Sequence, residues 1–262
     1  MNKLQQYYEK YSESNRLEKD KTSKIEFLTN IEYLNKYIKK GKLLDVGAGS
    51  GIYSSYYDEK EIEVTAIDVV QSHVNFMKEK FVDKNINVKL GSALDLSEFK
   101  ENSFEFVLCL GPIYHLRDKE ERIKCIKECN KVLKKGGILA VAYINKMHII
   151  PRYLGIHNEI IEKDVIEYFL KTGNFSSEVK DEFLKVSHFD YPEEIENLIV
   201  NEGNEVIEHI ASDSIWKLTK NEINNLTELE FELLLKYHLE TCNQKNSLGL
   251  SNHGLIISKK IS

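Results

Sequence analysis

The sequence lacks the features that mark secreted, membrane-spanning and zinc-binding proteins. Its four cysteines show neither a disulfide framework nor the C-x₂-C spacing of a zinc site, so we expect buried, reduced thiols and no bound metal. No apolar run approaches the ~20 residues that span a bilayer. Residues 1–6 form no apolar signal region. We therefore expect a cytoplasmic protein that does not act at a membrane.

The chain also has no excess of positive charge. It carries 36 lysine and arginine residues against 42 aspartate and glutamate residues, a formal net charge of −6. This balance provides no basic surface for nucleic acid or an anionic membrane. The length of 262 residues suffices for one sizeable core, or for one core with an attached cap. We expect a single domain over residues 1–262, as a monomer or a homodimer.

The stretch Leu43–Gly51 joins a strand directly to a glycine loop. Leu43–Val46 is predicted to be a short buried strand, and the glycines at 47, 49 and 51 leave the backbone bare and tolerant of positive φ. Ile52–Tyr57 is predicted to begin a helix. A ligand can lie against backbone amides at such a junction, at the carboxyl ends of the strands.

The glycine spacing indicates the kind of ligand. The pattern is G-x-G-x-G with Asp45 before it, whereas the dinucleotide fingerprint is G-x-G-x-x-G. A second predicted strand, Glu63–Asp68, ends in an acid about 20 residues after Gly47, where a carboxylate accepts hydrogen bonds from ribose hydroxyls. Asp68 could instead cap the following helix.

Strands and helices alternate without a break from Leu43 to Ile144. Further strands are predicted at 86–90, 103–110 and 138–144, with helices at 71–81 and between the last two strands. This alternation predicts a parallel sheet with helices on both faces. Strands at 204–211 and 253–259, with a helix at 227–242, are predicted to complete the sheet.

The order of motifs resembles that of the class I S-adenosylmethionine-dependent methyltransferases. The resemblance rests on Leu-Asp-Val-Gly-Ala-Gly-Ser-Gly, the acid that ends the second strand, Phe-Glu-Phe-Val-Leu and Val-Leu-Lys-Lys-Gly-Gly, and it covers residues 43–144. It implies an α/β fold with a Rossmann-like doubly wound sheet, mostly parallel with a C-terminal antiparallel strand. It also implies S-adenosyl-L-methionine as cofactor and methyl transfer to the oxygen, nitrogen or carbon of an acceptor.

The segment Gly-Pro-Ile-Tyr-His-Leu narrows the acceptor class. It resembles that of bacterial enzymes acting on small molecules, and the Asn/Asp-Pro-Pro-Tyr segment of amino-directed DNA methyltransferases does not occur in the chain. We therefore expect a small-molecule acceptor. Tyr114 and His115 follow the fourth strand and are the candidate catalytic residues. His115 is the leading base because histidine titrates near neutrality; alternatively, it only lines the cofactor pocket.

The resemblance also assigns a cofactor site. Its predicted residues in the core are Asp45, Gly47, Ala48, Gly49, Asp68, Val69, Ser92, Ala93, Leu94, Leu110 and Gly111. Ser92 departs from the family, in which an acid often follows the glycine beside the adenine ring. Backbone groups of Ala93 and Leu94, or the side chain of Asp95, could take its place.

The segments outside the core are expected to cover the site. Residues 1–40 form a predicted helical arm with Tyr7, Tyr8, Tyr11 and Arg16. Tyr11 and Arg16 are predicted to bind the cofactor, and Arg16 could pair bidentately with the methionine carboxylate. Plain packing of the tyrosines is the alternative. Residues 146–200 form a predicted helical cap between the core at 41–145 and the completion of the sheet at 201–262. Such insertions commonly shape a pocket. The alternative is a stabilising flap that does not contact the substrate.

Two other classes of function are consistent with the glycine loop. An NAD(P)-dependent oxidoreductase is disfavoured because the third glycine is one place early. The second class is a non-catalytic protein that binds S-adenosylmethionine and works through a partner. The presence of both Asp45 and Asp68 argues against a degenerate site but does not exclude this class.

Overall fold

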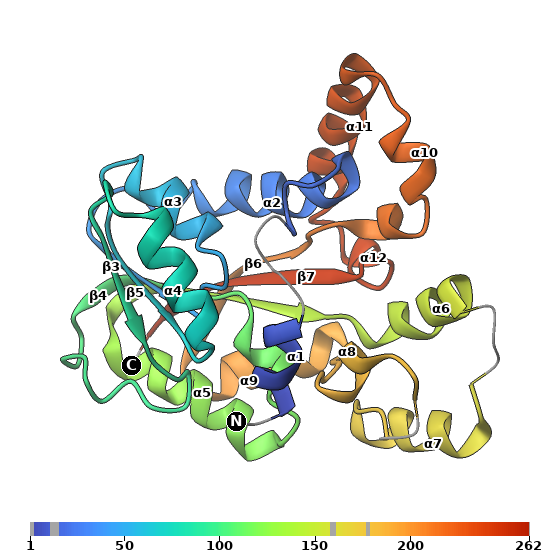
Figure 1. Ribbon diagram of the computed structural model, residues 1–262, viewed down its shortest axis with the longest axis horizontal. Helices are drawn as coiled ribbons and strands as arrows, with labels where there is room; N and C mark the ends of the chain where they lie inside the picture. The colour runs from blue at the N-terminus through green and yellow to red at the C-terminus, as the bar shows by residue number, and fades with distance from the viewer. Residues whose placement is uncertain (1–2, 11–15, 158–160, 177–178, 262) are drawn as a thin grey trace.

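In the computed structural model, residues 3–10, 16–157, 161–176 and 179–261 are described (Figure 1). In these residues a seven-stranded sheet has the order β3-β2-β1-β4-β5-β7-β6. Its strands are β1 (Lys42–Val46), β2 (Glu63–Asp68), β3 (Ile86–Leu90), β4 (Phe104–Cys109), β5 (Leu133–Ile144), β6 (Asn204–Ala211) and β7 (His253–Lys260). β1 to β5 are parallel, and β7 pairs antiparallel with both β5 and β6. The predicted fold class is confirmed.

Two layers of helices bury the two faces of the sheet. The neighbours Leu43 and Leu44 point to opposite faces, as strand geometry requires. Leu43 packs with residues of α2 (Lys21–Leu34) and α3 (Ile52–Asp58), and Leu44 packs with residues of α5 (Lys119–Val132) and α9 (Pro192–Asn201). Figure 1 shows α2 and α3 above the sheet and α5 and α9 below it. α4 (Gln71–Lys80) covers β2 and β3 through Met77.

Two predicted boundaries differ from the structure. β5 begins at Leu133 instead of residue 138, because Phe104 already pairs with Leu133 before the register shifts and Phe106 pairs with Ile138. α2 ends at Leu34, before the end of the predicted helical arm at residue 40, because the backbone then tightens into turns that include bonds between residues three apart.

The insertion after β5 divides into two parts. α6 (Lys146–His157), α7 (Lys163–Thr172) and α8 (Glu182–Lys185) lie around a separate aromatic cluster in which the rings of Phe169 and Phe175 stack at 4.4 Å. α9 instead packs on the sheet through Ile195 and Ile199, which are fully buried in the main core. The part that packs apart from the sheet therefore ends near Phe189, before the predicted boundary at 200.

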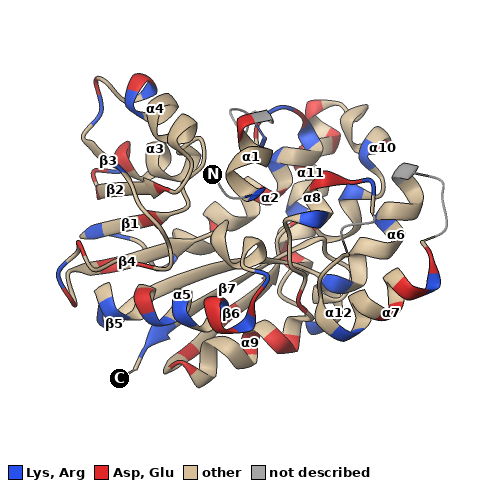
Figure 2. Ribbon diagram, turned by 60° about the horizontal axis from the view of Figure 1, so that its bottom comes forward, with Lys and Arg blue, Asp and Glu red and all other residues tan. Residues whose placement is uncertain are grey.

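The C-terminal part adds helices around β6 and β7. It contains α10 (Lys220–Asn224), α11 (Glu228–Thr241) and α12 (Lys245–Leu248), and α11 matches the predicted helix. Among the described residues, no helix has the length and apolar character needed to cross a membrane. Figure 2 shows acidic and basic residues interspersed over the outer helices.

Candidate functional site

The glycine loop after β1 is shaped by contacts that a side chain would prevent. Gly47, Gly49 and Gly51 have φ values of +71°, +58° and +72°. A Cβ on Gly47 would lie 2.7 Å from the ring of Pro112, and one on Gly51 would lie 2.6 Å from the ring of Phe81. Gly49 instead faces open space within 4 Å. The loop is therefore held closely on two sides and is open in the middle.

A cavity lies over this loop at the carboxyl ends of β1, β2 and β4. The predicted residues that line it are Arg16, Asp45, Gly47, Ala48, Gly49, Asp68, Val69, Ser92, Ala93, Leu94, Leu110, Gly111, Tyr114 and His115. Tyr11 lies outside the described residues. The cavity is also lined by Leu4, Tyr53 and His73, which the motifs did not single out. His73 lies one turn into the helix after Asp68, and this proximity is the signal that could have indicated it.

Asp68 joins the glycine loop to the turn after β2. Its Oδ2 accepts a hydrogen bond from the backbone N–H of Gly49 at 2.8 Å, and its Oδ1 accepts one from Val70 at 2.8 Å. Val70 is the N-cap residue of α4 and the helix has no side-chain cap bond, so Asp68 binds the residue before the helix and does not cap its first turn. A carboxylate has about four lone-pair sites, so these two bonds do not exhaust it.

His73 adds polar atoms to the same wall. Its Nδ1 lies 3.3 Å from Asp68 Oδ1, but neither ring nitrogen has a hydrogen-bond partner among the described residues. Buried polar groups are rarely left unpaired because desolvation is costly. This wall is therefore suited to a polar ligand.

Asp45 lies beneath the loop and is almost fully buried. Its Oδ2 accepts a hydrogen bond from Ser54 Oγ at 2.6 Å. Burial, with a smaller contribution from the charge of Asp68, raises the pKa of Asp45 to about 6, although the hydrogen bond from Ser54 acts in the opposite direction. A cation in the cavity would favour the charged form of Asp45.

His115 is engaged at both ring nitrogens. Nδ1 lies 3.2 Å from the carbonyl oxygen of Val186, and Nε2 lies 2.7 Å from the hydroxyl of Tyr8. Because a carbonyl only accepts, Nδ1 carries the proton and Nε2 accepts the hydrogen bond from Tyr8. Burial lowers the pKa of His115 to about 4. The expectation that this ring titrates near neutrality is therefore wrong.

Tyr114 contributes to the cavity wall in a different way. Its hydroxyl donates a hydrogen bond to the carbonyl oxygen of Leu110 at 3.2 Å, and its side chain packs with the aromatic cluster of the insertion. Tyr114 thus connects the end of β4 to the insertion.

The N-terminal helix α1 (Lys3–Lys10) contributes Leu4 and Tyr8 to the cavity wall, and Figure 1 shows α1 beside α8. Gln5 Nε2 donates a hydrogen bond to the carbonyl oxygen of Val69 at 3.1 Å. The rings of Tyr7 and Phe183, the latter on α8, are 6.0 Å apart. α1 therefore contacts both the end of β2 and the insertion, and Tyr8 reaches His115 between them.

The cysteines lie away from this cavity. All four are free and buried, as predicted. The sulfur atoms of Cys109, Cys125 and Cys129 lie within 4.8 Å of one another in the main core. Their spacing in the sequence does not reveal this group, because Cys109 is on β4 and the other two are on α5.

Known proteins share this sequence pattern. Residues 44–141 match the family model of a methyltransferase domain. The chain is 30% identical over 205 residues to the ubiquinone biosynthesis O-methyltransferase of Rickettsia canadensis, which covers 74% of this chain and 77% of that enzyme. The enzyme of the same name from Xanthomonas campestris is 29% identical over 107 residues, which cover 40% of this chain and 44% of that enzyme.

A solved structure shares the fold. A methyltransferase from Methanosarcina mazei that depends on S-adenosylmethionine has a TM-score of 0.61 at 20% identity, over 87% of this chain and 97% of that chain. Together with the glycine loop and the acid after β2, these matches define the class. The chain belongs to the class I S-adenosylmethionine-dependent methyltransferases. Its cofactor is S-adenosylmethionine, and the oxidoreductase alternative is ruled out.

Proposed function

We propose that this enzyme methylates a hydroxyl oxygen of a small-molecule acceptor. The observation that carries the proposal is the hydrogen-bonded pair of Tyr8 and His115, which line the cavity beside the glycine loop. A hydroxyl acceptor must lose its proton as the new bond forms, and this pair can receive one. The O-methyltransferase of Rickettsia canadensis supports oxygen as the acceptor atom.

The cavity fits the cofactor. The open backbone at Gly49 leaves room for it. The ring nitrogens of His73, which have no hydrogen-bond partner in the described part of the chain, lie beside Asp68, where a ribose would add hydrogen-bonding hydroxyls. Asp68 would accept from the ribose, Ala93 and Leu94 would lie against the adenine, and Asp45 would pair with the amino group. The remaining proposed contacts are backbone groups of Gly47, Ala48, Val69, Ser92, Leu110 and Gly111, with Arg16 at the carboxylate.

The bound cofactor supplies a methyl group on a sulfonium, so the protein need not form a covalent intermediate. The residues of the chain then act by placing the acceptor, and positioning of this kind can lower a barrier by roughly 7–11 kcal/mol in favourable cases. Tyr8, Tyr53 and Tyr114 line the cavity. An aromatic face beside a cation contributes about 0.5–2 kcal/mol.

The proton of the acceptor would follow the observed hydrogen bond. The acceptor hydroxyl gives its proton to the Tyr8 oxygen while Tyr8 gives its own proton to His115 Nε2. At neutral pH the His115 ring is unprotonated and can accept a proton, although its low pKa makes it a weaker base than an exposed histidine. Val186 holds the ring in the required tautomer through Nδ1.

An acceptor screen tests the proposal. The protein is incubated with S-adenosylmethionine and matched sets of phenols, catechols and amines, and methylated products are detected by mass spectrometry. We expect methyl ethers from hydroxyl acceptors. Methylation of amines alone would contradict oxygen as the acceptor atom, and cofactor binding without any product would favour the non-catalytic alternative.

Kinetics then test the role of His115. His115→Gln is expected to lower the single-turnover rate by about 10²–10⁴-fold, the usual contribution of a general base. Tyr8→Phe should also lower it, because the relay loses its hydroxyl. Retention of the full rate in His115→Gln would leave His115 as part of the pocket wall.

A further inference from the structure

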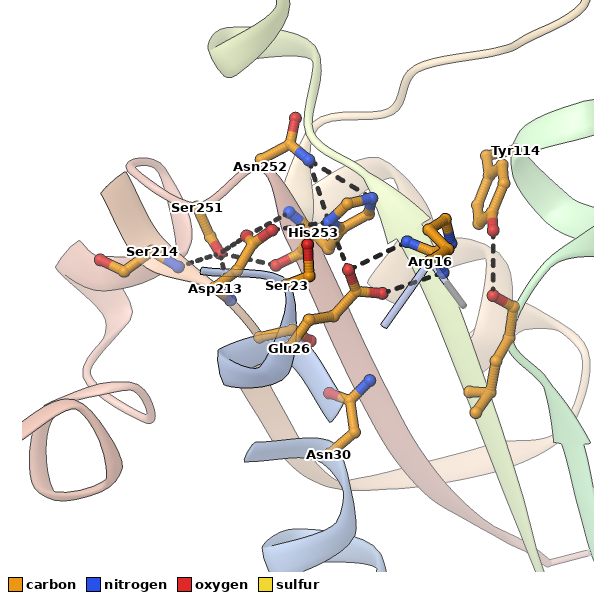
Figure 3. A network of polar contacts seen from close by, with 12 residues as sticks. Arg16, Ser23, Glu26, Asn30, Tyr114, Asp213, Ser214, Ser251, Asn252 and His253 are labelled. Carbon is orange, nitrogen blue, oxygen red and sulfur yellow. Dashed lines mark hydrogen bonds and ion pairs between the residues drawn. The ribbon is translucent and has the colours of Figure 1, made fainter. Parts of the chain in front are cut away.

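A series of charged side chains, of which Glu26 and Asp213 are buried, runs from Arg16 to the C-terminal strands (Figure 3). The two terminal nitrogens of Arg16 lie 3.1 and 3.3 Å from the two carboxylate oxygens of Glu26 on α2. Glu26 Oε2 lies 3.3 Å from His253 Nδ1, which lies 2.7 Å from Asp213 Oδ2. Arg16 lines the cavity and is bound by Glu26, ten residues further along the chain, and His253 and Asp213 from the C-terminal part lie behind Glu26.

The burial of Glu26 requires its carboxylate to be paired. Glu26 is 5% exposed, and a buried carboxylate is costly unless it is paired and hydrogen-bonded. Burial raises the pKa of Glu26, but the positive charges of Arg16, His253 and Lys217 outweigh this effect and hold the pKa below its ordinary value. Glu26 is therefore an anion that binds both terminal nitrogens of Arg16.

α2 supports a second side chain of the cavity in the same way. Asn30 follows Glu26 by one helical turn and lies on the same face of α2. Its Nδ2 donates a hydrogen bond to the hydroxyl of Tyr53 at 2.9 Å, and Tyr53 also lines the cavity. One face of α2 thus supplies the hydrogen-bond partners of both Arg16 and Tyr53.

We propose that Glu26 is a positioning residue that orients the guanidinium of Arg16 toward the carboxylate of the methionine part of the cofactor. This inference rests on the role proposed above for Arg16. A guanidinium is planar and presents its N–H donors in a fixed fork, so two bonds to Glu26 set its plane. Without Glu26, the long side chain of Arg16 would sample other rotamers and its bonds to a carboxylate would lose alignment.

Comparing the affinities for two ligands distinguishes a positioning role of Glu26 from a structural role. S-adenosylhomocysteine carries the amino-acid carboxylate, and 5′-methylthioadenosine has the same adenosine and sulfur without it. In calorimetry, Glu26→Gln should weaken the binding of S-adenosylhomocysteine by roughly 10- to 150-fold, the range for hydrogen bonds to a charged group. The affinity for 5′-methylthioadenosine should not change. Glu32→Gln removes an exposed charge from the same helix and should change neither affinity.

A double variant completes the test. Arg16→Ala should lose affinity for S-adenosylhomocysteine, and adding Glu26→Gln should cause no further loss, because the two residues act as one unit. Equal losses for both ligands, or losses that add, would overturn the inference. If Glu26→Gln does not fold, Glu26→Asp provides the same comparison between ligands. If the wild-type protein binds neither ligand, the proposed function fails and this inference fails with it.

Discussion

At the scale of single residues, burial changes two groups of the cavity in opposite directions. Low polarity disfavours the charged form of any group, so it raises the pKa of a carboxyl and lowers that of an imidazole. Asp45 has a pKa of about 6 and His115 one of about 4. Asp45 can therefore change its charge close to neutrality, whereas His115 remains neutral there.

Asp45 should make the stability of the protein depend on pH. Because its pKa is about 6 when folded and about 3.9 when unfolded, the folded state binds more protons between these values. The free energy of unfolding due to this group is therefore highest below pH 4 and falls by on the order of 3 kcal/mol as the pH rises through 6. Asp45→Asn should remove this fall, as measured by urea unfolding at pH 4.5 and 7.5.

The same variant has a second expected effect. At pH 7.5, Asp45→Asn should bind S-adenosylhomocysteine more weakly than wild type, because an ionised carboxylate pairs better with the amino group. A variant with wild-type stability profile and wild-type affinity would show that Asp45 neither changes its charge nor contacts the ligand.

Asp68 provides a further test at this scale. Asp68→Ala should weaken binding of S-adenosylhomocysteine by about 1.5–3 kcal/mol, because it removes acceptors for the ribose and the bond that holds Gly49. Calorimetry measures the change, with Asp83→Ala, an exposed acid after α4, as the control. An unchanged dissociation constant in a folded Asp68→Ala variant would limit Asp68 to its bonds with Gly49 and Val70.

At the scale of elements, the stability of helix α1 depends on its contacts with the rest of the protein. A helix of eight residues is too short to be stable alone. Its contacts to Val69, His115 and Phe183 place it over the cavity, and these contacts come from the core and from the insertion. We expect a ligand in the cavity to strengthen this arrangement, because Leu4 and Tyr8 line the same space.

Hydrogen exchange measures the order of this element. Amides of residues 3–10 should exchange more slowly when S-adenosylhomocysteine is present, because the ligand gives α1 further contacts. Peptides from α11, which contributes no residue to the cavity wall, should be unaffected. Equal exchange of α1 in both states would argue against a lid function for the arm.

At the scale of the whole molecule, one continuous sheet brings distant segments to a common edge. β1, β2 and β4 supply the cavity, and β7 supplies His253 to the charged residues behind it. The same packing buries all four thiols between the sheet and its helices.

The burial of the thiols has a measurable consequence. Ellman's reagent should react with none of the four cysteines of the native protein on the time scale of mixing, and with all four in denaturant, because the thiolate must reach solvent to react. Native mass spectrometry checks the number of labels. Rapid labelling of any cysteine before unfolding would show that its segment opens easily.

Much of the fold and part of the site could be predicted from the sequence, because their causes are local. The glycines at 47, 49 and 51 adopt positive φ at little cost because they have no side chain. Alternating apolar segments define a parallel sheet, and a parallel sheet places the residues after its strands at one edge. Asp45, Asp68, Tyr114 and His115 were found around one cavity for that reason.

The sequence by itself thus determined the class of fold, the glycine loop and the edge of the sheet where the cavity lies. Only the tertiary structure decided the partner of Arg16, the bond between Tyr8 and His115, and the protonation of that histidine. These features depend on contacts between side chains of different elements, from Arg16 and Glu26 ten residues apart to Tyr8 and His115 more distant in the chain, and on how deeply each group is buried. Charge, hydrogen bonding and pKa are set by that three-dimensional environment, which spacing along the chain does not specify.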